Sequence, residues 1–210
     1  MSDAAADPAR ARRPLMIPRA LRAWGDLGGS VREELDANPS EPQVFAWLMI
    51  ALAVHGVVAV PGEMLLPGMG GEAMPGIAFA TSVTLAPLLW YGISALVGAA
   101  IRAMGGKLSY GGHRVVWFWF ALVMLPVMLV QEMLALPAAL AGLTVLGDVL
   151  DILAAAAGLW VLVSFYRAAE DWGAMRADRK RFVLGLVYTA LVALVVVGVF
   201  AMIPMLLSAA

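Results

Sequence analysis

Three ionisable side chains lie inside or at the edge of long apolar stretches, where polar groups are functional candidates by default. His55 is eleven residues into the first apolar stretch, where an imidazole could face a water-filled cavity or bond to a neighbouring helix. Asp148 and Asp151 are three residues apart, so they share a helix face and could bind a cation or relay a proton. Carboxylates near a helix N-terminus are also favoured by the helix dipole, which explains this pair without a function.

A basic turn punctuated by glycines is a further candidate site. It comprises Arg102, Gly105, Gly106, Lys107, Ser109, Tyr110 and Arg114. Paired glycines can end a helix in the left-handed region, and a cation is favoured at a helix C-terminus. The lysine can reach anionic headgroups, and the serine and tyrosine can form hydrogen bonds at the membrane interface. The turn is therefore either a structural corner between two helices or a binding site for a lipid headgroup or a partner.

The sequence contains none of the motifs that mark common enzyme sites. No nucleophile elbow, HExxH helix, P-loop or dinucleotide-binding glycine motif after a strand occurs. Cysteine is absent, which excludes disulfides, thiolate zinc sites and iron–sulfur clusters. His55 and His113 are predicted to approach opposite membrane faces, which argues against a bis-histidine haem site. We therefore expect no enzymatic activity, no cofactor and no metal.

The composition indicates what kind of scaffold must position these residues. Of the 210 residues, 62% are hydrophobic and 14% are charged. Soluble domains average about 45–50% apolar and about 25% charged residues. This composition excludes an ordinary water-soluble enzyme, a disordered chain and a nucleic-acid binder, and it indicates a multi-pass membrane protein.

Five segments are apolar enough to be membrane helices, each needing about 20 residues. The first is predicted to end at Pro61-Gly62, the second contains Pro87, and the third contains Pro126 near its end and can continue to Leu136. The predicted spans are 44–60, 77–104, 115–130, 149–166 and 182–207. The expected fold is an all-α bundle of five transmembrane helices, with a cytoplasmic segment over 1–43 and a membrane domain over 44–207.

The distribution of basic residues predicts the orientation of the chain, because Lys and Arg collect in cytoplasmic loops. All fourteen fall in three regions that five spans place on one side: Arg10, Arg12, Arg13, Arg19, Arg22 and Arg32, then Arg102, Lys107 and Arg114, then Arg167, Arg176, Arg179, Lys180 and Arg181. The charged residues of the other two loops and their flanks are all acidic: Glu63, Glu72, Glu132, Asp148 and Asp151. We therefore expect a cytoplasmic N-terminus and an external C-terminus.

Apolar residues also recur at helical spacing before the first span. Ile17, Leu21, Trp24 and Val31 share one face over 17–34, with charged residues on the others. This pattern predicts an amphipathic helix on the cytoplasmic membrane surface. The alternative is a helix packed on the protein's own cytoplasmic loops, and three glycines weaken either helix.

The basic turn and its surroundings resemble a known family. The segment Arg102-Ala103-Met104-Gly105-Gly106-Lys107-Leu108-Ser109-Tyr110 is followed by His113-Arg114-Val115-Val116, Pro126, Leu159-Trp160 and Tyr166-Arg167-Ala168. This pattern resembles the bacterial branch of the Yip-domain family, the Rab-interacting membrane proteins, over roughly residues 80–205. The resemblance implies five spans with the N-terminus inside. The eukaryotic Asp-Leu-Tyr-Gly-Pro motif is absent, so the resemblance does not imply a role in Rab-linked vesicle traffic.

These observations predict a non-enzymatic scaffold of Yip-like type in the bacterial cytoplasmic (inner) membrane. Its expected partners are membrane lipid and other integral membrane proteins, with no nucleic acid. One alternative is an accessory subunit of a respiratory or photosynthetic complex. Another is a small transporter that couples ions through His55, Asp148 or Asp151. A scaffold is favoured over a transporter because no inverted repeat is visible and few polar groups lie at mid-bilayer depth.

Overall fold

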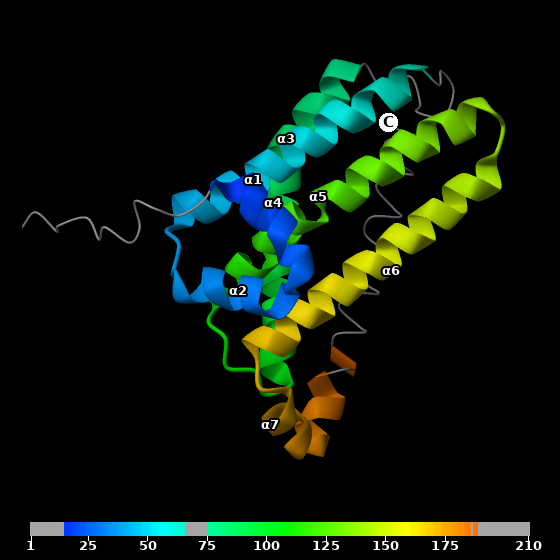
Figure 1. Ribbon diagram of the computed structural model, residues 1–210. Helices are drawn as coiled ribbons and strands as arrows, with labels where there is room; N and C mark the ends of the chain where they lie inside the picture. Colours follow the sequence, from blue (N-terminus) through cyan, green and yellow to red (C-terminus); the bar gives the residue numbers. More distant parts are fainter. Residues whose placement is uncertain (1–14, 66–74, 186, 189–210) are drawn as a thin grey trace, which may run out of the picture.

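The computed structural model describes residues 15–65, 75–185 and 187–188, and every element in this part of the chain is a helix. In chain order the elements are α1 (Met16–Arg22), the 3-10 turn η2 (Ala23–Gly25), α2 (Leu27–Asp36), α3 (Glu41–Leu65), α4 (Pro75–Ala103), α5 (Tyr110–Leu140), α6 (Thr144–Ala169) and α7 (Trp172–Ala177). Residues 179–185 are also helical. The long helices α3 and α6 both pack on α5, and α1 and α2 lie across one end of them (Figure 1).

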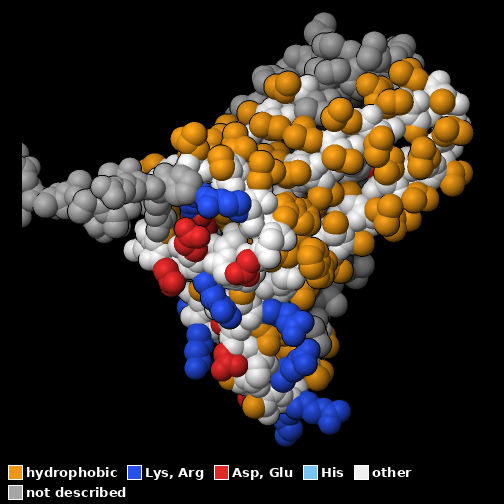
Figure 2. Space-filling model, in the orientation of Figure 1, with side chains coloured by type: hydrophobic (Ala, Val, Ile, Leu, Met, Phe, Trp, Pro, Cys, Tyr) orange, Lys and Arg blue, Asp and Glu red, His pale blue; other side chains and the backbone are white. Residues whose placement is uncertain are grey.

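Three of these helices have the length and apolar composition needed to cross a membrane: Ala86–Ala103 within α4, all of α5 and all of α6. A shorter apolar helix covers Glu41–Val57 within α3. Hydrophobic side chains cover the surface over α3, α5 and α6 (Figure 2). The described residues contain helices and no strand, which confirms the all-α class, and three of the helices fit a membrane protein in length and composition. Of the predicted fifth span, only 182–185 and 187–188 lie within the described residues, and they are helical.

Several helices extend further than predicted. The backbone of α3 stays helical through Pro61 and ends at Leu65, so the predicted end at Pro61-Gly62 is wrong. Helix α5 likewise continues through Pro126 and Pro137 to Leu140. A proline removes one helical hydrogen bond, whereas unwinding in apolar surroundings would leave several backbone groups without partners. At 31 residues α5 is about 46 Å long, so it must tilt in a ~30 Å hydrocarbon core or project beyond it.

The N-terminal region forms two helices rather than the single helix predicted over 17–34. The chain bends at Asp26, whose side chain caps α2 by accepting a hydrogen bond from the backbone N–H of Gly29 at 2.8 Å. Of the predicted apolar face, Val31 is fully buried, whereas Ile17 and Leu21 are 64% and 54% exposed. The prediction of one continuous amphipathic helix is therefore wrong, because an aspartate cap and the turn before it start a second helix in a new direction.

Hydrogen bonds attach this N-terminal region to α5 and α6. The indole N–H of Trp24 donates to the carbonyl of Val123 at 2.9 Å, and the indole N–H of Trp119 donates to the hydroxyl of Ser30 at 2.7 Å. Arg19 forms an ion pair with the buried carboxylate of Glu34. The region thus packs on the protein itself, as in the alternative interpretation, and leaves part of α1 exposed.

Helices α4 and α5 approach closely at a glycine. A Cβ added to Gly98 would lie 2.8 Å from Cδ2 of His113, a side chain on α5 that is fully buried. Ser94, one turn earlier, is also fully buried, whereas Ala95 and Ala103 are exposed. Of the small residues spaced four apart in this span, the packed face is therefore the one that contains Ser94 and Gly98.

Candidate functional site

The predicted basic turn forms a tight corner between α4 and α5. Gly105 has a φ of +105°, and its N–H donates to the carbonyl of Arg102 at 3.0 Å. The N–H of Gly106 donates to the carbonyl of Ile101 at 2.9 Å. This pair of bonds is a Schellman motif, which satisfies the last carbonyls of a helix. The predicted left-handed helix end is therefore confirmed at Gly105.

The second glycine is needed for a different reason than predicted. Only Gly105 and Gly142 have positive φ among the described glycines, so the expectation that Gly106 also adopts positive φ is wrong. A Cβ added to Gly106 would lie 2.5 Å from Cγ2 of Ile101 and 2.8 Å from Oε1 of Glu170. The space beside Gly106 is filled by a side chain from another helix, and sequence spacing alone does not reveal such a neighbour.

Glu170 is the principal residue of this corner that the sequence analysis missed. It lies at the C-terminal cap of α6 and is 9% exposed. Its Oε2 accepts a hydrogen bond from the backbone N–H of Lys107, and its Oε1 accepts one from the N–H of Leu108, both at 2.8 Å. The carboxylate thus fixes the turn after α4 to the end of α6. The available signal was a pair of acidic residues, Glu170 and Asp171, directly after an apolar span in a segment rich in basic residues.

A second basic cluster joins the corner from the chain beyond α7. The guanidinium of Arg181 donates to the carbonyls of Arg102 and Ala103, both at 3.3 Å. A cation is favoured there because the last carbonyls of α4 carry the negative end of the helix dipole. Arg102, Lys107 and Arg181 are all exposed, so three positive charges from two distant segments lie around one turn.

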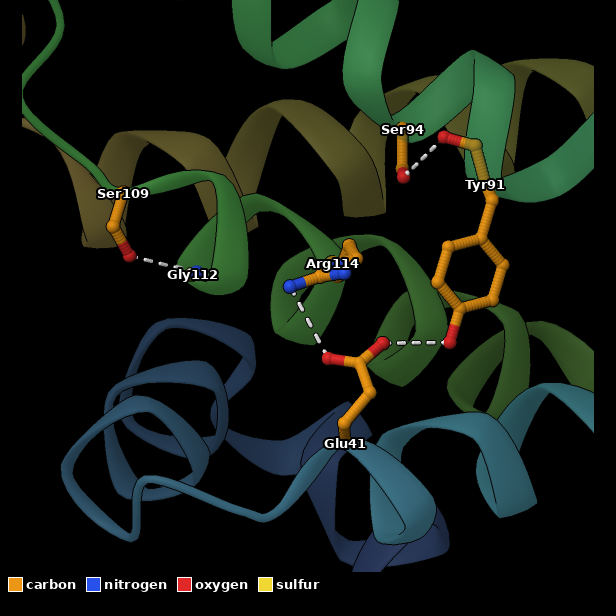
Figure 3. A network of polar contacts seen from close by, with 6 residues as sticks. All are labelled: Glu41, Tyr91, Ser94, Ser109, Gly112 and Arg114. Carbon is orange, nitrogen blue, oxygen red and sulfur yellow. Dashed lines mark hydrogen bonds and ion pairs between the residues drawn. The ribbon is translucent and has the colours of Figure 1, made fainter.

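The first residues of α5 complete the corner (Figure 3). The Ser109 hydroxyl caps α5 by accepting the N–H of Gly112 at 3.0 Å. Tyr110 is 50% exposed, and the guanidinium carbon of Arg102 lies 4.7 Å from its ring centroid. Ser109 therefore has a structural role, whereas the Tyr110 ring and Arg102 form an exposed cation–π pair.

Arg114 points to a different contact. Its Nη2 lies 3.1 Å from Oε2 of Glu41, and the hydroxyl of Tyr91 donates to Oε1 of the same carboxylate at 2.7 Å (Figure 3). Glu41, Tyr91 and Arg114 come from α3, α4 and α5, so the shared carboxylate connects these three helices. The charge of Arg114 is thus paired with Glu41, whereas Arg102, Lys107 and Arg181 form no ion pair with any other described residue.

The three polar candidates of the apolar stretches are dispersed. His55 is a half-buried residue of α3, and its Nδ1 has no hydrogen-bond partner among the residues that the structure describes. Asp148 and Asp151 are exposed on α6, and Oδ1 of Asp151 accepts a hydrogen bond from the side-chain amide of Gln131 on α5 at 2.6 Å. Within the described ranges no group of three His, Asp or Glu residues could hold a metal ion. The observed role of Asp151 is to join α5 to α6.

The chain was compared with family models, with curated proteins and with solved structures. No family model, no curated protein and no solved structure matches the chain. The resemblance to the Yip-domain family therefore stays a prediction.

Proposed function

We propose that this protein is a non-enzymatic scaffold of Yip-like type in the bacterial inner membrane, with five spans, a cytoplasmic N-terminus and an external C-terminus. Its corner between α4 and α5 recognises an acidic surface on a partner membrane protein. The single observation that carries this proposal is the Glu170 clamp, which holds a turn with three exposed cations in one conformation.

Contacts between the basic segments support the proposed orientation. Arg32 donates from Nε to the carbonyl of Ala168 at 3.0 Å, and Arg181 donates to the carbonyl of Arg102. Three basic regions far apart in the sequence therefore meet at one end of the molecule. Lys and Arg gather around α2 and α7, and those around α2 border the lower edge of the hydrophobic surface (Figure 2). The positive-inside rule assigns that end to the cytoplasm.

The electrostatic energy and the fixed conformation of the corner favour recognition of a partner over attachment of the protein to the membrane. A basic residue near an anionic surface contributes about 1 kcal/mol, and salt weakens that attraction. Three such residues add little to the attachment of a protein that already spans the bilayer. A turn fixed by Glu170 loses little conformational freedom on binding, which favours a specific contact.

A protein partner is favoured over a headgroup by where the positive charge lies. In Figure 2 the Lys and Arg side chains around α7 lie at the end of the molecule farthest from the hydrophobic surface. Positive charges this far from the hydrophobic surface lie beyond the headgroup layer, where they can contact a cytoplasmic protein surface. Organisation of anionic lipid by the corner is the competing outcome of the test below.

The test uses the purified full-length chain in mild detergent, with co-purifying proteins identified and bound lipids measured. Lys107→Glu reverses the charge on the turn and keeps the backbone N–H that Glu170 accepts. Arg22→Glu makes the same charge change on α1 and is the matched control. We expect one protein to co-purify with the wild type at a fixed stoichiometry. Lys107→Glu should lower the amount of that protein at least fivefold, and the control variant should leave it unchanged. If Lys107→Glu lowers the amount of bound lipid and leaves the co-purifying proteins unchanged, the corner binds lipid. If neither amount changes, the proposal is contradicted.

The proposed span number has its own test. Single cysteines introduced at Ser2 and Ser208 are labelled with a membrane-impermeant reagent in intact cells. We expect labelling at position 208 and protection at position 2. Labelling of both from outside would require an even number of spans and would overturn the topology.

A further inference from the structure

A groove between the N-terminal region and α6 has no part in the proposed corner. It is open to the surface and has a volume of about 420 Å³. Its walls are Trp24, Gly28 and Arg32 on one side and Trp160, Ser164 and Arg167 on the other. The groove therefore combines two indoles, two guanidinium groups and a glycine, which together suit an amphipathic ligand.

The aromatic part of the groove continues into the apolar surface of α6. The ring centroids of Trp24 and Trp160 are 6.4 Å apart. Trp160 is 56% exposed, and its neighbour Leu159 is 64% exposed. Both residues lie in the last three turns of α6, and tryptophan is enriched at the level where a membrane helix leaves the hydrocarbon.

The basic part of the groove lies one to two turns further along α6. Arg167 is exposed, and none of the described contacts pairs its side chain with an acidic group. The Nε–H of Arg32 donates to the carbonyl of Ala168, which fixes the guanidinium beside α6. The other four N–H groups of the guanidinium can donate to a ligand. The nearby acid Asp26 is used as the cap of α2. Two arginines therefore remain to bind an anion, and their planar groups suit phosphate.

Close backbone packing sets the width of the groove. A Cβ added to Gly28 would lie 3.4 Å from Cβ of Ala168, so α2 approaches α6 closely at this point. Positive and hydrophobic side chains adjoin where α2 meets α6 (Figure 2). An occupant of this position meets cations at one end and apolar side chains at the other.

We propose that this groove binds one anionic phospholipid of the surrounding bilayer. Its phosphodiester is held between Arg32 and Arg167, and its acyl chain lies along Trp160 and Leu159. A free phosphate would use the arginines alone, whereas the adjoining indoles and leucine match a ligand with an apolar chain. This site is separate from the corner of Lys107 and does not depend on its function.

Native mass spectrometry of the full-length protein in detergent tests the proposal, with phosphatidylglycerol titrated and phosphatidylcholine as the zwitterionic comparison. Arg167→Ala is the main variant because this side chain forms no hydrogen bond or ion pair with the described residues. We expect the Kd of the tightest phosphatidylglycerol site to rise about fivefold, which corresponds to about 1 kcal/mol. Arg32→Ala should act in the same direction, and Arg179→Ala, a matched loss of an exposed arginine outside the groove, should not.

Three results would overturn the proposal. Equal phosphatidylglycerol affinity in wild type and Arg167→Ala would show that the groove is not the site. Equal affinity for phosphatidylcholine would remove the role of net negative charge. Displacement of phosphatidylglycerol by millimolar inorganic phosphate would assign the arginines to a free anion. Lys107→Glu should leave this lipid bound, so failure here is distinguishable from failure of the proposed scaffold function.

Discussion

The carboxylate of Glu170 accepts the backbone N–H of Lys107 at 2.8 Å, although 63 positions separate the two residues. The same carboxylate accepts the N–H of Leu108, so both of its oxygens bind the turn between α4 and α5. This contact turns a glycine-rich segment into a fixed surface. It also brings the end of α6 to the end of α4.

Removal of this carboxylate should destabilise the corner. Glu170→Ala leaves two backbone N–H groups without their partner in a mostly buried position, and we expect a loss of about 3 kcal/mol in the free energy of unfolding. Glu170→Gln keeps one acceptor oxygen and should cost less. Thermal unfolding in detergent measures both, with Glu33→Ala as the control for an exposed acid on α2. Equal melting temperatures for Glu170→Ala and Glu33→Ala would contradict the role of the clamp.

The three glycines around the turn should respond differently to alanine. Gly105→Ala places a Cβ on a residue with φ +105°, which costs about 1–3 kcal/mol. Gly106→Ala collides with Ile101 and Glu170, so it should destabilise the fold and weaken the clamp together. Gly111→Ala meets only ordinary contacts, the nearest at 3.8 Å, and should be neutral or slightly stabilising. The prediction is wrong if the melting temperatures of all three variants agree.

Two glycines of α4 provide a matched pair for helix packing. Gly98→Ala forces its Cβ against the buried ring of His113, and overpacking of this kind costs about 1–3 kcal/mol. Gly92→Ala meets nothing within 4 Å and should stabilise the helix by about 0.5–1 kcal/mol. Unfolding of the two variants side by side measures the difference. A Gly98→Ala protein at least as stable as Gly92→Ala would mean that α4 and α5 are not in close contact there.

The N-terminal region should be protected from hydrogen exchange. Leu27 and Val31 are buried, and Ser30 accepts the indole N–H of Trp119, so α2 should exchange slowly in the full-length protein. Ser30→Ala removes that hydrogen bond and should speed exchange in α2 severalfold, with little change in α6. Exchange in wild-type α2 as fast as in an unfolded peptide would show that the region does not dock on α5.

Composition and periodicity were sufficient to predict the helical class and the three helices, α4, α5 and α6, that have the length and composition to cross a membrane. Long apolar runs must form helices in lipid, because every backbone group there needs a partner within its own segment. The same reasoning located the end of α4, since paired glycines before a lysine are a local signal for a Schellman motif. These properties depend on neighbours in the sequence, so the sequence alone reveals them.

Tertiary structure decided which of these local features meet. Glu170 fills the space beside Gly106, Arg181 donates to the carbonyl of Arg102, and Glu41 pairs with Arg114. Each contact joins residues that are more than sixty positions apart in the sequence. The bend at Asp26 turned one predicted amphipathic helix into two docked helices. Such contacts depend on where helices cross and how side chains fill the space between them. The distance in space between two residues far apart in the sequence cannot be read from a single sequence, because it is set only when the helices pack.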